Sequence, residues 1–140
     1  MARRIAQNLK GGEVIELVGD VGSGKTTFTQ GLAAGLGYQG DVPSPTFTLS
    51  RAYPVKDGRT LYHFDFYRLG GHDIVTDELD EVMQDTHAIT AIEWAGQGEA
   101  QLPMRRIRIT IEPGATADSR QLTIESLGKA LDYVLKGVAS

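Results

Sequence analysis

An eight-residue loop near the start of the chain constrains its fold more than any other feature. The loop reads Gly19-Asp20-Val21-Gly22-Ser23-Gly24-Lys25-Thr26 and fits the phosphate-binding pattern G-x-x-x-x-G-K-[ST]. Its glycines let the backbone wrap around an anion with the N–H groups directed inward. In such a loop Lys25 reaches the β- and γ-phosphates of a nucleotide, and the hydroxyl of Thr26 is a ligand for Mg²⁺. The loop therefore predicts a nucleotide site.

The segments on either side of the loop agree with this prediction. Residues 13–18 read as a short apolar strand, and residues 27–36 read as a helix with its apolar side chains on one face and Gly37 as its stop. The N-terminus of such a helix adds partial positive charge to a phosphate site. The competing interpretation is a glycine-rich turn that happens to precede a lysine.

Length and composition limit the remaining choices. A chain of 140 residues, 41% hydrophobic and 23% charged, is expected to fold as one globular domain. No apolar run approaches the roughly 20 residues of a membrane span, and no signal peptide is recognisable. The absence of cysteine excludes disulfide-linked partners and thiol catalysis. We therefore expect a cytoplasmic protein without membrane partners.

The charge of the chain argues against unaided binding to nucleic acid. The net charge is −4, whereas chains that grip nucleic acid alone are usually basic. Residues 69–104 contain no lysine or arginine but eight acids, namely Asp73, Asp77, Glu78, Asp80, Glu81, Asp85, Glu93 and Glu99. This acidic stretch is either an ordinary solvated surface or a docking surface for a basic partner protein.

The rest of the chain is predicted to alternate between short strands and helices. A stiff loop with two prolines is followed by an antiparallel pair of strands with a turn between them, then by a weakly patterned helix, three strands and an amphipathic helix. The predicted ranges are 47–53, 60–67, 75–83, 88–92, 106–112, 121–125 and 127–138. No helix or strand is predicted before Glu13. The predicted fold is α/β: a P-loop NTPase-like mixed sheet flanked by helices, with the nucleotide at the end of the first strand.

Two acidic residues are candidates for the chemistry beside the phosphates. Glu93 closes the apolar run 88–92, and Asp65 lies in an alternating strand. Magnesium takes oxygen ligands, commonly one or two from acidic or hydroxyl side chains. Glu93 could instead be a surface acid, and Asp65 could instead pair with Arg68 or face water.

Other polar residues leave two interpretations open. Thr46, on the loop with two prolines, either belongs to a switch that responds to the γ-phosphate and Mg²⁺ or caps a turn beside Pro45. Three arginines are candidate phosphate or base contacts and equally candidate surface charges: Arg51, Arg68 and Arg120. Three scattered histidines suit surface or packing positions better than a zinc site: His63, His72 and His87.

Guanine recognition through an Asn-Lys-x-Asp motif is excluded, because the one asparagine, Asn8, precedes the loop. ATP is therefore the expected nucleotide.

Four motifs in this order resemble the TsaE family, also called YjeE, the bacterial ATPases of tRNA threonylcarbamoyladenosine biosynthesis. They are the loop itself, Ser-Pro-Thr-Phe-Thr-Leu at residues 44–49, Leu-Tyr-His-Phe-Asp-Phe-Tyr-Arg-Leu at 61–69, and Glu-Trp at 93–94. The resemblance extends from about Leu9 to Leu127. Any phosphate-loop protein can carry the first motif, whereas the second and third are much more specific.

The resemblance implies a set of roles. It implies that residues Gly22 to Thr27 hold the phosphates of ATP, that Thr26 and Glu93 hold Mg²⁺, that Thr46 belongs to a switch and that Asp65 assists hydrolysis. Arg120 corresponds loosely to an arginine that lies near the nucleotide in the family. The implied function is Mg²⁺-dependent ATP hydrolysis in support of TsaB and TsaD, which bear the transferase chemistry, with tRNA contacted only through that complex.

Two other functions fit the same residues. The chain could be a binding module that distinguishes ATP from ADP without significant turnover, or a small-molecule phosphotransferase. The second is disfavoured because the chain has little room for an acceptor domain. For hydrolysis, we expect Lys25, the loop amides and Mg²⁺ to stabilise the transferring phosphoryl group, and Asp65 or Thr46 to place the attacking water.

Overall fold

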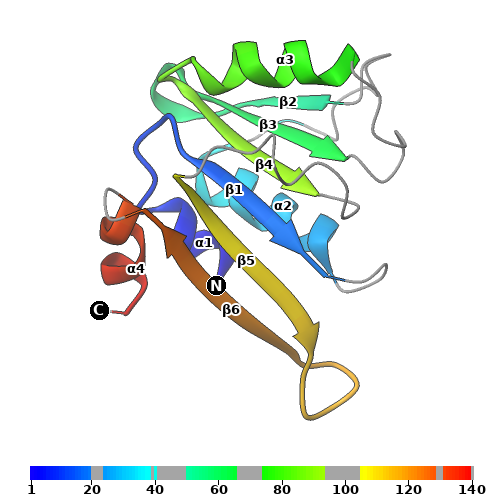
Figure 1. The fold of residues 1–140 in the computed structure, drawn as a ribbon. Coiled ribbons are helices and arrows are strands. Elements are labelled where there is room, and N and C mark those ends of the chain that lie inside the picture. The colour runs from blue at the N-terminus through cyan, green and yellow to red at the C-terminus, as the bar shows by residue number, and fades with distance from the viewer. Residues whose placement is uncertain are drawn as a thin grey trace.

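Six strands and four helices make up the computed structural model (Figure 1), which describes residues 1–19, 24–38, 40, 50–65, 74–93, 105–128 and 131–139. The strands are β1 (Val14–Val18), β2 (Ser50–Pro54), β3 (Thr60–Asp65), β4 (Ala88–Glu93), β5 (Arg106–Pro113) and β6 (Arg120–Leu127). The helices are α1 (Ala2–Ala6), α2 (Lys25–Gly35), α3 (Ile74–Met83) and α4 (Asp132–Ala139), with a 3₁₀ turn, η1 (Lys56–Gly58), between β2 and β3. The predicted α/β class is confirmed.

The strands form one mixed sheet in the order β2-β3-β4-β1-β5-β6. The four central strands run parallel, and the two edge strands, β2 and β6, run antiparallel to their neighbours. Because parallel strands end at the same edge, the carboxyl ends of β1, β3, β4 and β5 all lie at one edge of the sheet, as the arrowheads in Figure 1 show. The order changes direction at β1, which is where α/β proteins of this kind bind ligands.

Most of the predicted elements are confirmed, although residues 47–49 and 66–67 of the predicted strands lie outside the described part. Two differences concern the last helix and the N-terminus. Leu127, predicted to open the last helix, instead ends β6, because Gly128 with φ of +115° turns the chain before α4 begins. The helix α1 was not predicted.

The core lies on both faces of the sheet. On one face, Ile15, Leu17 and the apolar side chains of β5 pack against α1, α2 and α4. On the other face, a smaller cluster joins Phe64 and Ile92 to Leu79 of α3. All six residues of β4 are buried, which accounts for its unbroken apolar run up to Glu93.

The unpredicted helix α1 packs closely on α2. A Cβ added at Gly35 would lie 2.7 Å from the Cβ of Ala6, and one added at Gly31 would lie 2.8 Å from the Cβ of Ala2. Two glycines one helical turn apart therefore let the two helices approach, and Ile5 is completely buried as a result. The contact makes α1 part of the layer that supports the phosphate-loop helix.

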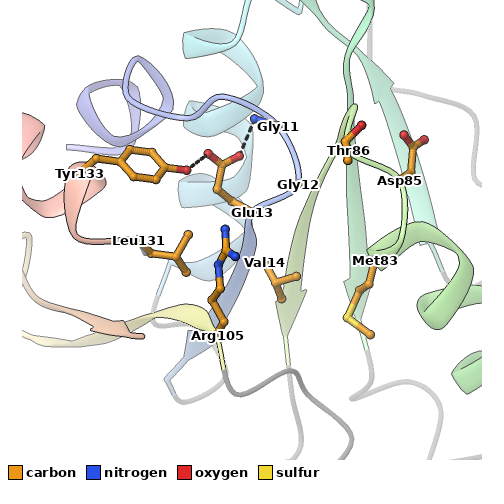
Figure 2. Close-up of a pocket in the computed structure, with 10 residues that line it drawn as sticks. All are labelled: Gly11, Gly12, Glu13, Val14, Met83, Asp85, Thr86, Arg105, Leu131 and Tyr133. Carbon is orange, nitrogen blue, oxygen red and sulfur yellow. Dashed lines mark hydrogen bonds between the residues drawn. The ribbon is translucent and has the colours of Figure 1, made fainter. Parts of the chain in front are cut away.

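A hydrogen-bonded carboxylate joins α4 to the start of β1 (Figure 2). The side chain of Glu13 is buried and accepts hydrogen bonds from the backbone N–H groups of Lys10 and Gly11, both at 2.7 Å. It also accepts a hydrogen bond from the hydroxyl of Tyr133 on α4. These three donors satisfy a charge that would otherwise be costly to bury.

This contact predicts that stability falls at high pH. Burial, and then the hydrogen bond to the Glu13 carboxylate, raise the pKa of Tyr133 above its usual value of about 10. The contribution to stability is complete below about pH 10 and is lost as the pH rises further, because the unfolded chain releases the proton first. Tyr133→Phe should therefore flatten the decline in the free energy of unfolding above about pH 10, measured by urea titration. Parallel curves for the two proteins would contradict this assignment.

Candidate functional site

Three of the predicted site positions meet at the carboxyl edge of the sheet. In the parallel register, Glu93 at the end of β4 lies opposite Leu17 of β1 on one side and opposite Asp65 of β3 on the other. Gly19 follows β1 directly, at the same edge. The sheet therefore brings together the start of the loop and both predicted acidic positions, although they come from three separate segments of the chain.

The loop leads from β1 into α2, as predicted. Gly24 precedes the helix with φ of +103°, a conformation that favours glycine, and α2 begins at Lys25. Thr27 is exposed in the first turn, and Thr26 is helical, although its side chain is not described. The predicted contacts of Asp20, Val21, Gly22 and Ser23 lie outside the described residues, and their roles stay predictions. The N-terminus of α2 thus faces the end of β1, where it can stabilise an anion.

Lys25 is more enclosed than a solvated phosphate-loop lysine is expected to be. The residue is 6% exposed, and its Nζ donates a hydrogen bond of 2.6 Å to the carbonyl oxygen of Gly19. The hydroxyl of Thr29 donates in turn to the carbonyl oxygen of Lys25 at 3.1 Å. An ammonium group has three donors, so donation to the loop backbone does not by itself exclude donation to phosphate.

A histidine that the sequence did not assign to the site contacts the predicted metal ligand. The Nε2 atom of His63 lies 3.1 Å from Oε1 of Glu93, and both residues are buried, at 7% and 5% exposure. The pair spans β3 and β4 beneath the edge where the loop begins. Glu93 is therefore a buried acid and not the surface acid of the competing interpretation.

The donor set at this edge fits Mg²⁺. Among the residues that the structure describes, His63 is the one hydrogen-bond partner of the Glu93 side chain, which leaves Oε2 of this buried carboxylate without a hydrogen bond there. A carboxylate oxygen close to a phosphate loop is the kind of ligand that Mg²⁺ takes. No group of three or more His, Cys, Asp or Glu residues suited to a metal was found in the described part of the chain. Glu93 could supply one such oxygen, whereas the role of Thr26 stays a prediction because its side chain is not described.

The structure gives only part of the information needed for the other three predicted residues, Asp65, Thr46 and Arg120. Asp65 occupies the register position opposite Glu93, but its side chain is not described. Thr46 lies outside the described residues. Arg120 starts β6 beside the end of β5, at the same edge of the sheet, and its guanidinium donates to the carbonyl oxygens of Ala117 and Ser119 in the adjoining turn. The roles of all three residues stay predictions.

The acidic stretch is partly described. Asp80 and Glu81 on α3 and Asp85 after it are exposed, as both interpretations of this stretch require. His87 is also exposed, with its Nδ1 3.7 Å from Oδ1 of Asp85, which agrees with a surface position. His72 lies outside the described residues.

A cavity of about 350 Å³ lies at the opposite, amino edge of the sheet (Figure 2). Glu13, Tyr133, Arg105 and Asp85 contribute to its lining, between the start of β1, the start of α4 and the end of α3. It is separated from the loop by the length of β1. No described helix is long and apolar enough to span a membrane.

Comparisons with known proteins point to a single family. The family profile described as "Threonylcarbamoyl adenosine biosynthesis protein TsaE" matches residues 1–122. The chain is 40% identical over 134 residues to the "tRNA threonylcarbamoyladenosine biosynthesis protein TsaE" of Streptomyces coelicolor, covering 92% of this chain and 90% of that protein. It is also 40% identical over 139 residues to the protein of the same name from Bacillus subtilis, covering 96% and 82%.

A solved structure has the same fold. The crystal structure of Bacillus subtilis YdiB superposes with a TM-score of 0.76 at 34% identity, covering 99% of this chain and 84% of that chain. The likeness therefore extends through the whole sheet and its helices. Because the family profile matches most of the chain and both relatives are 40% identical over most of its length, the chain belongs to the TsaE family.

Proposed function

We propose that the chain is a Mg²⁺-dependent ATP hydrolase that supports formation of threonylcarbamoyladenosine on tRNA. The observation that carries this proposal is that Gly19, where the loop begins, the N-terminus of α2 and the buried carboxylate of Glu93 meet at one edge of the sheet. The names of the relatives, which refer to tRNA threonylcarbamoyladenosine biosynthesis, support the biological role.

The residues of the chain would position ATP and the attacking water and would neutralise the negative charge of the phosphates. The loop amides and the ammonium group of Lys25 would bind the phosphates in front of α2. Thr26 and Glu93 would hold Mg²⁺, which when bound neutralises charge on the phosphate oxygens. Asp65 or Thr46 would orient the attacking water. Phosphoryl transfer needs little more from a protein than this alignment and electrostatic stabilisation.

We further propose that the chain works as a subunit together with TsaB and TsaD. Its net charge of −4 does not suit unaided binding of tRNA, so contact with tRNA would be made through the complex. This feature suits a protein that hydrolyses ATP on behalf of partners.

Hydrolysis by the isolated chain is expected to be slow and to rise about tenfold or more when TsaB and TsaD are added, since a partner can order a phosphate-transfer site. The measurement is steady-state release of phosphate, with Lys25→Ala as the control for contaminating ATPases. Fast hydrolysis whose rate does not change when TsaB and TsaD are added would indicate a free-standing enzyme. Nucleotide-dependent association without turnover would indicate a binding module, and a phosphorylated small acceptor would indicate a phosphotransferase.

The same assay separates the two interpretations of the acidic stretch. Asp80 and Glu81 are exposed on α3, so changing both to lysine should leave ATP binding intact. If this surface docks a basic partner, the reversed chain loses stimulation by TsaB and TsaD, and the loss is largest at low salt. Full stimulation of the reversed chain would identify a solvated surface.

A further inference from the structure

The buried contact between His63 and Glu93 is not used in the proposed chemistry. The side chains of these two residues are 8% and 6% exposed, and the atoms in contact, Nε2 and Oε1, are 3.1 Å apart. Neither side chain has another hydrogen bond among the residues that the structure describes. Each side chain is therefore the main polar neighbour of the other at a buried position.

The strands fix where this pair lies. His63 is opposite Ala91 in the register of β3 and β4, so Glu93 is its diagonal neighbour one step closer to the phosphate loop. Leu61 and Ala91, which precede the two residues on the same face of the sheet, are completely buried. Two buried apolar side chains therefore lie next to the pair on this face of the sheet.

The chemistry of the two groups fixes the direction of the bond. A carboxylate that binds a metal ion is ionised and can only accept a hydrogen bond, so in that state Nε2 of His63 carries the proton and donates it. The bond occupies Oε1 and leaves Oε2 of Glu93 as the oxygen available at the edge of the sheet. A hydrogen bond to one oxygen of a carboxylate restricts the rotation of the group and so fixes the direction of its second oxygen.

We propose that His63 is a positioning residue that holds Oε1 of Glu93 and thereby presents Oε2 to the Mg²⁺ of the bound nucleotide. The proposal rests on the proposed function, since it assigns Glu93 to that ion. Groups that hydrogen-bond to a metal ligand commonly change metal affinity by about 10- to 100-fold when they are removed. His63 acts through Glu93 and does not touch the nucleotide.

The test measures metal affinity apart from activity. Mn²⁺ would be titrated into the complex of the full chain with ADP, and free Mn²⁺ would be followed by electron paramagnetic resonance. His63→Leu, which removes the donor, should weaken Mn²⁺ binding about 10- to 100-fold. His63→Gln, which can place an amide N–H near Oε1, should restore the affinity to within about threefold of the wild type.

Two controls distinguish positioning from a general structural role. ADP affinity in EDTA should be the same for wild type, His63→Leu and His63→Gln. In a chain that already carries Glu93→Gln, His63→Leu should cause no further loss of Mn²⁺ affinity. A loss that persists in that background, or a loss of ADP affinity in EDTA, would overturn the proposal.

A measurement on the wild-type chain keeps the proposal testable even if His63→Leu does not fold. Nitrogen-15 correlation spectra of the imidazole should show Nε2 of His63 carrying a proton, and an unprotonated Nε2 would overturn the proposal. Failure of the proposed function has a different signature, namely wild-type chain that binds neither ADP nor ATP with Mg²⁺. If the wild type binds Mn²⁺ and ADP but His63→Leu binds Mn²⁺ equally well, the positioning role alone is refuted.

Discussion

Lys25→Ala should weaken ATP binding by about 10- to 150-fold, the range expected for the loss of one hydrogen-bonded charge worth about 1.5–3 kcal/mol. Hydrolysis should fall further, by about 10²–10³, because the ammonium group also stabilises charge that develops during transfer. Calorimetric titration with ATP and a phosphate-release assay measure the two effects. The variant also loses the 2.6 Å bond to the carbonyl oxygen of Gly19, and a charged hydrogen bond of this kind contributes about 1.5–3 kcal/mol to the free energy of unfolding.

The matched variant for this test is Lys25→Met, which keeps most of the aliphatic stem of this buried residue but removes the charge. If the charge is what binds phosphate, Lys25→Met and Lys25→Ala bind ATP equally poorly, and Lys25→Met unfolds at a temperature closer to the wild type. ATP affinity and hydrolysis that survive in both variants would show that the loop does not form a nucleotide site.

Glu16→Ala should lower the free energy of unfolding by about 3–5 kcal/mol, the usual cost of removing one partner from a buried ion pair. Glu16 lies in the middle of β1 and is 3% exposed. Its Oε1 accepts hydrogen bonds from Nε of both Arg106 and Arg108 on β5, each at 2.9 Å. Urea unfolding, followed by circular dichroism, measures the loss. Because β1 carries the loop, the variant should also bind ATP more weakly at temperatures near its melting point.

Arg108→Met is the comparison for this second prediction. The Arg108 side chain is 26% exposed, whereas that of Arg106 is 10% exposed, and Glu16 keeps its bond to Arg106 when Arg108 is replaced. The expected loss is about 1 kcal/mol, nearer the value of a partly exposed pair. Equal losses for Glu16→Ala and Arg108→Met would show that the carboxylate is not the centre of this network.

Those parts of the fold with strong local patterns could be predicted from the sequence. The apolar run of β4, the alternation of β5 and the helix after the loop each carry their own periodicity, and each was found close to its predicted position. The helix α1 has only five residues, and its stability depends on the close contact with Gly31 and Gly35 of α2. A contact between distant segments leaves no periodic pattern in either of them, so α1 could not be predicted.

The residues of the candidate site also differ in whether a local sequence pattern identifies them. The loop and Glu93 have recognisable surroundings in the sequence: a glycine pattern for one, and the end of an apolar run for the other. His63 could not be assigned to this site, because its contact with Glu93 depends on the register between β3 and β4. The available signal was that His63 precedes Asp65 by two residues and so shares its face of the strand.

The central position of β1 has a consequence for the synthesis of the protein. The backbone partners of β1 are residues 90–93 of β4 and 107–110 of β5, which the ribosome produces long after residues 14–18. The nascent chain must therefore carry an unpaired apolar strand, with the loop attached to it, until most of the protein has been made. Any truncation before β5 leaves one side of β1 without its partner strand. Prematurely terminated chains should consequently be substrates for chaperones and proteases and not partly active proteins.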